Sequence, residues 1–244
     1  DMFKIGVGPS SSHTLGPWKA ALHCMQNNEF SKGIDQITKL QIFLYGSLAK
    51  TGKGHGTDMA VLMGFMGEDP ITTDTSLITS KIEEIKKTHT ILLNGQQPIN
   101  FNVNDDLLFL KDQSLPHHPN ALKFAITIGE QIFTYTYYSI GGGFIEYQNM
   151  QGEITTPVVD LPADVPFDFY TTDELLHWCM KTGMNISEVV KENEKTILSE
   201  STINERLDHI WQTMFNCIYK GCKTDGVLPG GLQVRRRAFD LNKQ

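Results

Sequence analysis

A run of hydroxyl and imidazole side chains near the start of the chain could bind an anion and transfer a proton. Ser10, Ser11, Ser12, His13 and Thr14 follow a Gly-rich turn and precede the apolar spacing of a helix. The free N–H groups and positive dipole of a helix N-terminus, with hydroxyl donors beside them, suit a carboxylate or phosphate. The structural alternative is that the serines only cap the helix.

A second histidine lies in another Gly-rich stretch. Gly54 and Gly56 flank His55, and Thr57 and Asp58 follow it. An uncovered imidazole with a hydroxyl and an acid beside it suits proton transfer. The alternative is a plain loop in which Thr57 or Asp58 caps the next helix.

Three further stretches are weaker candidates. Residues 115–120 (LPHHPN) could hold a small polar ligand but read more simply as a turn, and residues 139–144 (SIGGGF) indicate a β-bulge or a close backbone approach. Residues 228–237 combine a Pro-Gly-Gly turn with three arginines, and the simplest expectation is that these arginine side chains lie in solvent. The four cysteines, which are irregularly spaced, are expected to be reduced structural thiols: Cys24, Cys179, Cys217 and Cys222.

The elements that must position these groups can be read from periodicity. Apolar spacing predicts helices over 15–25, 59–66 and 77–85, and a buried strand over 40–45. Residues 90–147 read as a meander of strands, with an Asn94-Gly95 hairpin turn. Beyond a Pro-rich segment, three helices are predicted, with caps at Thr171 and Glu174, at Ser187, and at Thr202 and Glu205.

The pattern indicates two domains. We expect an α+β first domain, a mixed sheet with helices, over residues 1–150, a linker over 151–170, and an all-α, incomplete second domain over 171–244. The third predicted helix of that second domain carries an apolar face, so dimerisation or packing against further sequence is expected. That face consists of Ile203, Leu207, Ile210, Trp211, Met214 and Ile218.

Composition excludes several classes of partner. The formal net charge is −7, so no general attraction to nucleic acid or to an anionic membrane is implied. No apolar stretch approaches the ~20 residues of a membrane span, and the first residues do not read as a signal peptide. We therefore expect a cytoplasmic protein that binds a small molecule.

Four ordered motifs together resemble one family. GVGPSSSHTLGP at the start, GHGTD at 54–58, SIGGGF at 139–144 and LPGGLQVRRRA at 228–238 resemble the iron-sulfur L-serine dehydratases of bacteria. The resemblance implies that residues 1–150 form the family's first (β) domain, similar to an allosteric substrate-binding fold. The rest would begin its catalytic (α) domain.

The resemblance also implies a chemistry. A [4Fe-4S] cluster would act as a Lewis acid on the hydroxyl that leaves L-serine, while a base removes the α-proton and pyruvate and ammonia form. Ser10, Ser11, Ser12 and Thr14 would hold the substrate carboxylate, and the catalytic residues His13, His55 and Thr57 would face the cluster, with either histidine as the base. His118 and Asn120 would bind serine as an effector, with Pro119 standing where some members have an acidic residue.

The family's cluster cysteines lie after the LPGGL segment, so no metal ligand is expected in this sequence, and the chain alone is expected to be inactive. The partners implied are L-serine, the remainder of the catalytic domain and a second copy in a homodimer. Two alternatives stay open: a regulatory amino-acid-binding module without catalysis, and a phosphate-binding protein that uses the Gly/Ser loop as an anion nest.

Overall fold

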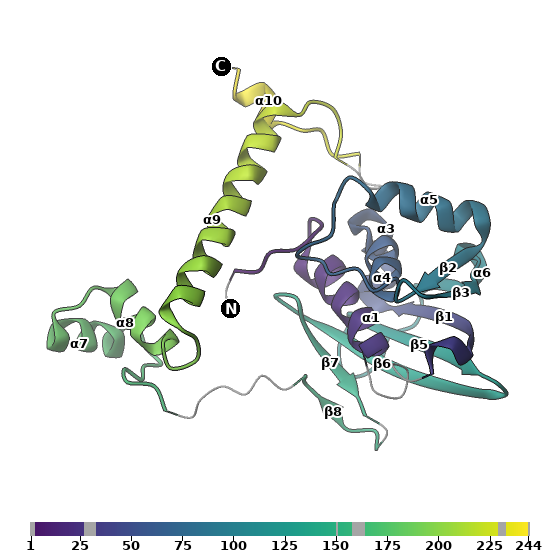
Figure 1. Ribbon diagram of the computed structural model, residues 1–244, viewed down its shortest axis with the longest axis horizontal. Helices are drawn as coiled ribbons and strands as arrows, with labels where there is room; N and C mark the ends of the chain where they lie inside the picture. The colour runs from purple at the N-terminus through teal and green to yellow at the C-terminus, as the bar shows by residue number, and fades with distance from the viewer. Residues whose placement is uncertain (1–2, 27–32, 150, 158–163, 229–232, 244) are drawn as a thin grey trace. The chain divides into compact units, whose positions relative to one another are not determined.

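The computed structural model describes residues 3–26, 33–149, 151–157, 164–228 and 233–243 (Figure 1). The chain divides into two compact units, Asp1–Pro157 with Asp225–Arg237, and Val158–Thr224 with Ala238–Gln244. None of the helices in the described ranges combines the length and the apolar character that crossing a membrane requires.

The first unit is built on a mixed sheet. Among the described residues its strand order is β4-β1-β5-β6-β7-β8, with β1 and β4 parallel and the remaining pairs antiparallel. The α+β prediction is therefore confirmed. The strands are β1 (Ile37–Tyr45), β4 (Leu107–Leu110), β5 (Ala121–Ile128), β6 (Gln131–Gly141), β7 (Phe144–Gln148) and β8 (Ile154–Thr155).

A separate hairpin joins β2 (Thr90–Leu93) to β3 (Gln97–Asn100). Asn94 and Gly95 both have positive φ, 47° and 68°, as a type I′ turn requires, so the predicted turn is confirmed. The prediction of one continuous meander is wrong at β4, because β4 pairs in parallel with β1 rather than with a sequence neighbour. The short β8 lies inside the predicted linker.

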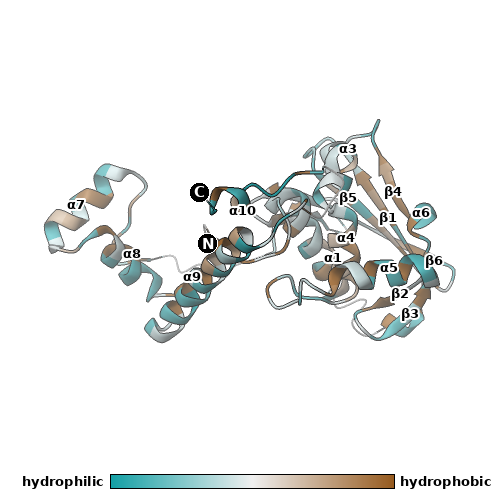
Figure 2. Ribbon diagram, turned by 90° about the horizontal axis from the view of Figure 1, so that it is seen from above, coloured by the Kyte–Doolittle hydropathy of each residue, from teal (hydrophilic) through white to brown (hydrophobic). Residues whose placement is uncertain are grey.

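Helices cover one face of this sheet (Figure 1). The predicted helices are confirmed as α1, α4 and α5, and β1 contributes Leu40, Ile42 and Leu44 to the core beneath them. Figure 2 shows the corresponding brown, apolar colour along β1 and β4. Among its described residues, the helices of this unit are η1 (Ser11–Leu15), α1 (Gly16–Gln26), η2 (Ile34–Gln36), α3 (Gly46–His55), α4 (Thr57–Phe65), α5 (Ile78–Thr88) and α6 (Val103–Asp106).

Helices α1 and α4 approach each other closely. A Cβ added at Gly64 of α4 would lie 2.5 Å from the carbonyl oxygen of Trp18 in α1. The Trp18 side chain is buried, and its Nε1 donates to the carbonyl oxygen of Glu68 at 2.6 Å. This packing fixes α1, and with it the π-helical turn η1 that leads into α1.

The second unit is helical in its described residues: α7 (Thr172–Thr182), α8 (Ile186–Glu194), α9 (Glu200–Lys223) and α10 (Ala238–Leu241). The capping box of Thr171 and Glu174 is confirmed. The other two predicted caps are wrong, because Asn185 caps α8 and Ser199 caps α9, each accepting from the backbone N–H three residues later. In α9, Ile203 is buried, whereas Leu207, Trp211 and Ile218 are exposed.

Candidate functional site

The first unit brings its two predicted histidines together. His13 lies in η1 and His55 is the last residue of α3, and their ring centroids are 4.9 Å apart. Both side chains are half-buried. Two segments far apart in the sequence therefore present a pair of imidazoles at one place.

The segment that carries His13 is a π-helical turn. Ser10 caps it from an extended conformation, and its Oγ accepts from the His13 backbone N–H at 3.2 Å. Leu15 N donates to Ser10 O across five residues, which widens the turn. Gly8 is required before it, because its φ is 97° and a Cβ there would lie 2.4 Å from the Thr14 side chain.

Serine hydroxyls contact both nitrogens of His13. Ser12 Oγ lies 3.0 Å from Nδ1, and Ser47 Oγ lies 3.0 Å from Nε2. Burial lowers the pKa of His13 from its ordinary value, and the nearby His55 lowers that pKa further. The ring of His13 is therefore held in place, and its protonated form is disfavoured.

His55 is held differently. Its Nδ1 lies 3.0 Å from the carbonyl oxygen of Thr51, one turn earlier in α3. A carbonyl only accepts, so Nδ1 carries a hydrogen, and in the neutral ring Nε2 then has the free lone pair. No hydrogen bond joins Nε2 to any described residue. Gly56, with φ of 69°, ends α3 and lets α4 begin immediately.

Two buried threonines tie the histidine segments to each other. Thr14 Oγ1 donates to the carbonyl oxygen of His55 at 2.9 Å, and Thr57 Oγ1 donates to the carbonyl oxygen of His13 at 2.5 Å. Each hydroxyl follows one histidine and holds the backbone of the other. These two hydroxyls are therefore committed to the backbone, unlike those of Ser10, Ser11 and Ser12, whose side chains are exposed or half-buried.

The SIGGGF segment packs against the same turn. Gly141, Gly142 and Gly143 all have positive φ, and the register of β6 and β7 shifts between Ser139 and Gly141, so the predicted bulge is confirmed. A Cβ added at Gly16 would lie 2.0 Å from Ser139 Oγ. The Ser139 hydroxyl is buried and has no hydrogen-bond partner among the described residues.

The His118-Pro119-Asn120 stretch reaches the site through its backbone. The carbonyl oxygen of Pro119 accepts from Ser47 N at 2.9 Å, and Ser47 in turn contacts His13. Asn120 is buried, its Nδ2 donates to Ser139 O at 3.2 Å, and its own N–H donates to His118 Nδ1 at 3.1 Å. The stretch is thus connected to His13 through Pro119 and Ser47, whereas Asn120 itself is hydrogen-bonded to Ser139 and His118.

Sequence reasoning missed Ser47. A signal was present, because Ser47, Thr51 and His55 are spaced by four and therefore share one face of α3. The LPGGLQVRRRA motif is not brought to the site by any described contact. Its residues 229–232 lie outside the described residues, and Val227 and Arg235 on either side of them pair as an antiparallel bridge.

The four cysteines are divided between the two units. Cys24 is buried in α1, whereas Cys179, Cys217 and Cys222 belong to the second unit. Burial raises the pKa of Cys24 well above its ordinary value, which keeps it a thiol. Within the described ranges, no three His, Cys, Asp or Glu side chains come together as metal ligands.

The sequence of this chain is similar to those of known proteins. The family model described as "Serine dehydratase beta chain" matches residues 1–150. The chain is 39% identical over 245 residues to "L-serine dehydratase 1" of Escherichia coli K12, which covers all of this chain and 53% of that protein. It is 40% identical over 246 residues to the "L-serine dehydratase" of Streptomyces coelicolor, covering all of this chain and 54% of that protein.

The "L-serine dehydratase" of Haemophilus influenzae is 36% identical over 244 residues, which cover 99% of this chain and 52% of that protein. The chain thus spans about half the length of the curated relatives it matches.

Proposed function

Because the chain belongs to the serine dehydratase beta chain family, we propose that it supplies the substrate-binding and proton-transfer residues of an L-serine dehydratase. The complete enzyme would convert L-serine to pyruvate and ammonia. The observation that carries the proposal is the pair of imidazoles beside a run of serine hydroxyls. A base and an anion-binding turn are what removal of a proton next to a carboxylate requires.

We assign the base to His55. Its Nδ1–H is fixed on the Thr51 carbonyl, so the lone pair of Nε2 is available to accept the α-proton of serine. His13 is a poorer base, because serine hydroxyls already contact both of its nitrogens. As the α-proton passes to Nε2 of His55, the electron pair of the C–H bond forms a C=C bond and the β-hydroxyl leaves as hydroxide, which takes up a proton to give water. In the complete enzyme a [4Fe-4S] cluster would supply the Lewis acid for this departure. The product of that step then takes up water and releases ammonia, leaving pyruvate.

The remaining residues bind and position. Ser10, Ser11 and Ser12, with the first amides of η1, would hold the substrate carboxylate. Thr14 and Thr57 would act as positioning residues, because their hydroxyls are used to hold the two histidine segments together. His118 and Asn120 would form an effector site, and its connection to catalysis would run from Pro119 through Ser47 to His13.

A [4Fe-4S] cluster is proposed as the cofactor of the complete enzyme, with its ligands outside this sequence. The thiols present here do not fit such a cluster, since one is buried in α1 and the described residues hold no grouped ligand set. We further propose a cytoplasmic homodimer in which the remainder of the catalytic domain completes the site. An exposed apolar face on α9 supports such packing.

The test uses the complete protein that contains this chain, reconstituted without oxygen with iron and sulfide, and measures pyruvate and ammonia from L-serine. His55→Asn is expected to lower kcat by about 10²–10⁴-fold with little change in KM, the range for loss of a general base. The matched control is His89→Asn at an exposed histidine with positive φ, which Asn tolerates. Full kcat in the His55 variant would remove the base assignment.

A binding measurement separates catalysis from recognition. Calorimetric titration of the 244-residue chain with L-serine, with D-serine as control, tests whether the site is formed without the cofactor. Stereoselective binding that Ser10→Ala weakens would support a preformed substrate site. Equal heats for both enantiomers would count against it.

A further inference from the structure

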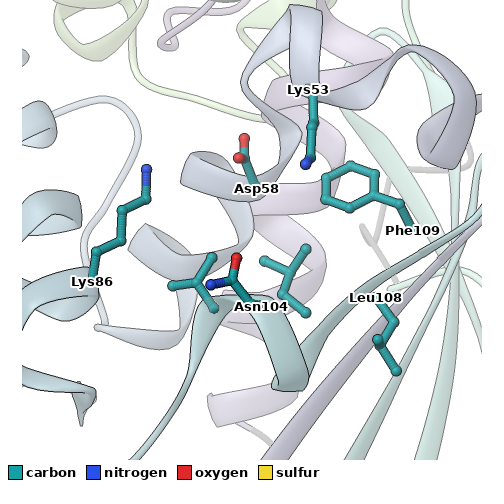
Figure 3. A pocket seen from close by; sticks show the side chains of 8 residues that line it. Lys53, Asp58, Lys86, Asn104, Leu108 and Phe109 are labelled. Atoms are coloured by element: carbon teal, nitrogen blue, oxygen red, sulfur yellow. The ribbon is translucent and has the colours of Figure 1, made fainter.

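A second candidate site lies beside the turn that carries His55. A cavity of about 330 Å³ is lined by side chains from α3, α4, α5, α6 and β4. Its volume is at the lower end of the range for small-molecule sites, ~300–1,000 Å³. The lining residues are Lys53, Asp58, Lys86, Val103, Asn104, Leu107, Leu108 and Phe109 (Figure 3).

The cavity collects three charged groups that have no ionic partner. Among the described residues, no ion pair or hydrogen bond joins the side chains of Lys53, Asp58 or Lys86 to another group. One lysine elsewhere in this unit does have an acidic partner, since Lys81 pairs with Glu68. The charges around this cavity are therefore free to meet a ligand.

The charges are also arranged in a pattern. Figure 3 shows Lys53 and Lys86 on opposite sides of the cavity, with Asp58 between them and the Asn104 amide facing the same space. The apolar part of the lining comes from Val103, Leu107 and the ring of Phe109, over which Lys53 Nζ lies at 5.2 Å from the centroid. A ligand here meets two cations, one anion and a short apolar floor.

We propose that this cavity binds an acidic amino acid. Two carboxylates would pair with Lys53 and Lys86, the α-ammonium group would pair with Asp58, and the methylene groups would lie on the apolar floor. The charges of such a ligand, two negative and one positive, match those of the site with opposite sign. A neutral amino acid would leave one lysine unpaired, and a simple dicarboxylic acid would leave Asp58 unpaired.

The cavity lies beside the turn that carries His55, so a bound ligand could affect the position of that histidine. Lys53 and Asp58 line the cavity, whereas His55 and Thr57, which lie between them in sequence, contact the His13 segment. Gly56, with φ of 69°, makes this reversal of direction possible. A ligand that joins the end of α3 to the start of α4 would therefore act on the backbone that positions His55.

The binding does not depend on the proposed function and is measured directly. The 244-residue chain is titrated by calorimetry with L-glutamate, L-aspartate, L-glutamine and glutarate. L-Glutamate or L-aspartate is expected to bind, and L-glutamine and glutarate are expected to bind about tenfold more weakly, since each lacks one charge-assisted contact. Lys53→Gln and Lys86→Gln are each expected to weaken binding of the acidic amino acid about tenfold.

Lys87→Gln is the matched control, because Lys87 is an exposed neighbour of Lys86 on α5 that does not line the cavity. An amide NMR spectrum recorded during the titration is expected to show shifts at Gly56 and Thr57. The proposal is overturned if no acidic amino acid binds, if both lysine variants bind as the parent does, or if glutarate and L-glutamine bind as well as L-glutamate. None of these results bears on whether the complete protein dehydrates L-serine.

Discussion

The two threonine contacts predict that Thr57→Val destabilises the first unit. Valine has the shape of threonine but lacks the hydroxyl that donates to the His13 carbonyl at 2.5 Å, and Thr57 is fully buried. The variant therefore loses a hydrogen bond and leaves the part-buried His13 carbonyl without that donor, which costs about 1–3 kcal/mol. Thr14→Val removes the reciprocal contact and is expected to cost a similar amount.

The assay is urea denaturation followed by the fluorescence of Trp18, which is buried in the first unit. Trp178 and Trp211 belong to the second unit and are replaced by Phe in every variant, so that only Trp18 reports. With a slope of about 2 kcal/mol per molar urea, a loss of 1–3 kcal/mol lowers the midpoint by about 0.5–1.5 M.

A double variant tests whether the two contacts act together. Both hydroxyls hold the same two segments, so the cost of removing both is expected to differ from the sum of the single costs by about 0.5–3 kcal/mol. The control is Thr88→Val on α5, whose hydroxyl makes an exposed contact with Glu84 O, and which should change stability by less than about 0.5 kcal/mol. A Thr57 variant as stable as this control would refute the reasoning.

Three further predictions concern the first unit. Ser139→Ala is expected to leave the melting temperature unchanged or raise it, because the buried hydroxyl has no partner among the described residues; a fall of several degrees by calorimetry would contradict this. Gly64→Ala is expected to cost about 1–3 kcal/mol in urea denaturation, because its Cβ would lie 2.5 Å from Trp18 O; an unchanged midpoint would argue against the close approach of α1 and α4. Burial lowers the pKa of His23 below its ordinary 6.5, so the unfolded chain binds a proton that the folded unit resists. The contribution of His23 to the free energy of unfolding should then be present above about pH 6.5 and be lost as the pH drops below that value. In His23→Gln, the free energy of unfolding should fall less between about pH 7.5 and about pH 5.5 than in the parent chain.

Local sequence patterns predicted several helices and a hairpin, and they singled out His13 and His55 as candidate site residues. Apolar spacing located α1, α4 and α5, and the Asn94-Gly95 pair located a hairpin, because these signals are contained in a few neighbouring residues. The partner of β4 was not predictable in this way. An apolar run such as Leu107–Leu110 indicates a buried strand but carries no information on which strand it pairs with.

Errors in the helix caps have a similar origin. Asn185 and Ser187 are both good N-cap residues two positions apart, and Ser199 and Thr202 are both good N-cap residues three positions apart. In each case the earlier residue is the cap, and the later one lies inside the helix. Ser47 was missed because its partner, His13, is 34 residues away, and only the fold of β1 into α3 brings the hydroxyl to the ring.

The short turn between α3 and α4 would link the proposed base, His55, directly to the proposed ligand cavity. His55 needs its Thr51 contact to keep Nε2 free, and Thr57 needs its His13 contact to hold the second segment. Lys53 and Asp58, which would form ion pairs with a ligand, are each within three residues of His55. A ligand can shift such a turn only if it binds one arrangement of it more tightly than another. Since α3 and α4 both contribute a charged group to the cavity, a ligand that contacts both would favour one separation of these helices. It would thereby change the population of the arrangement in which the rings of His13 and His55 lie side by side.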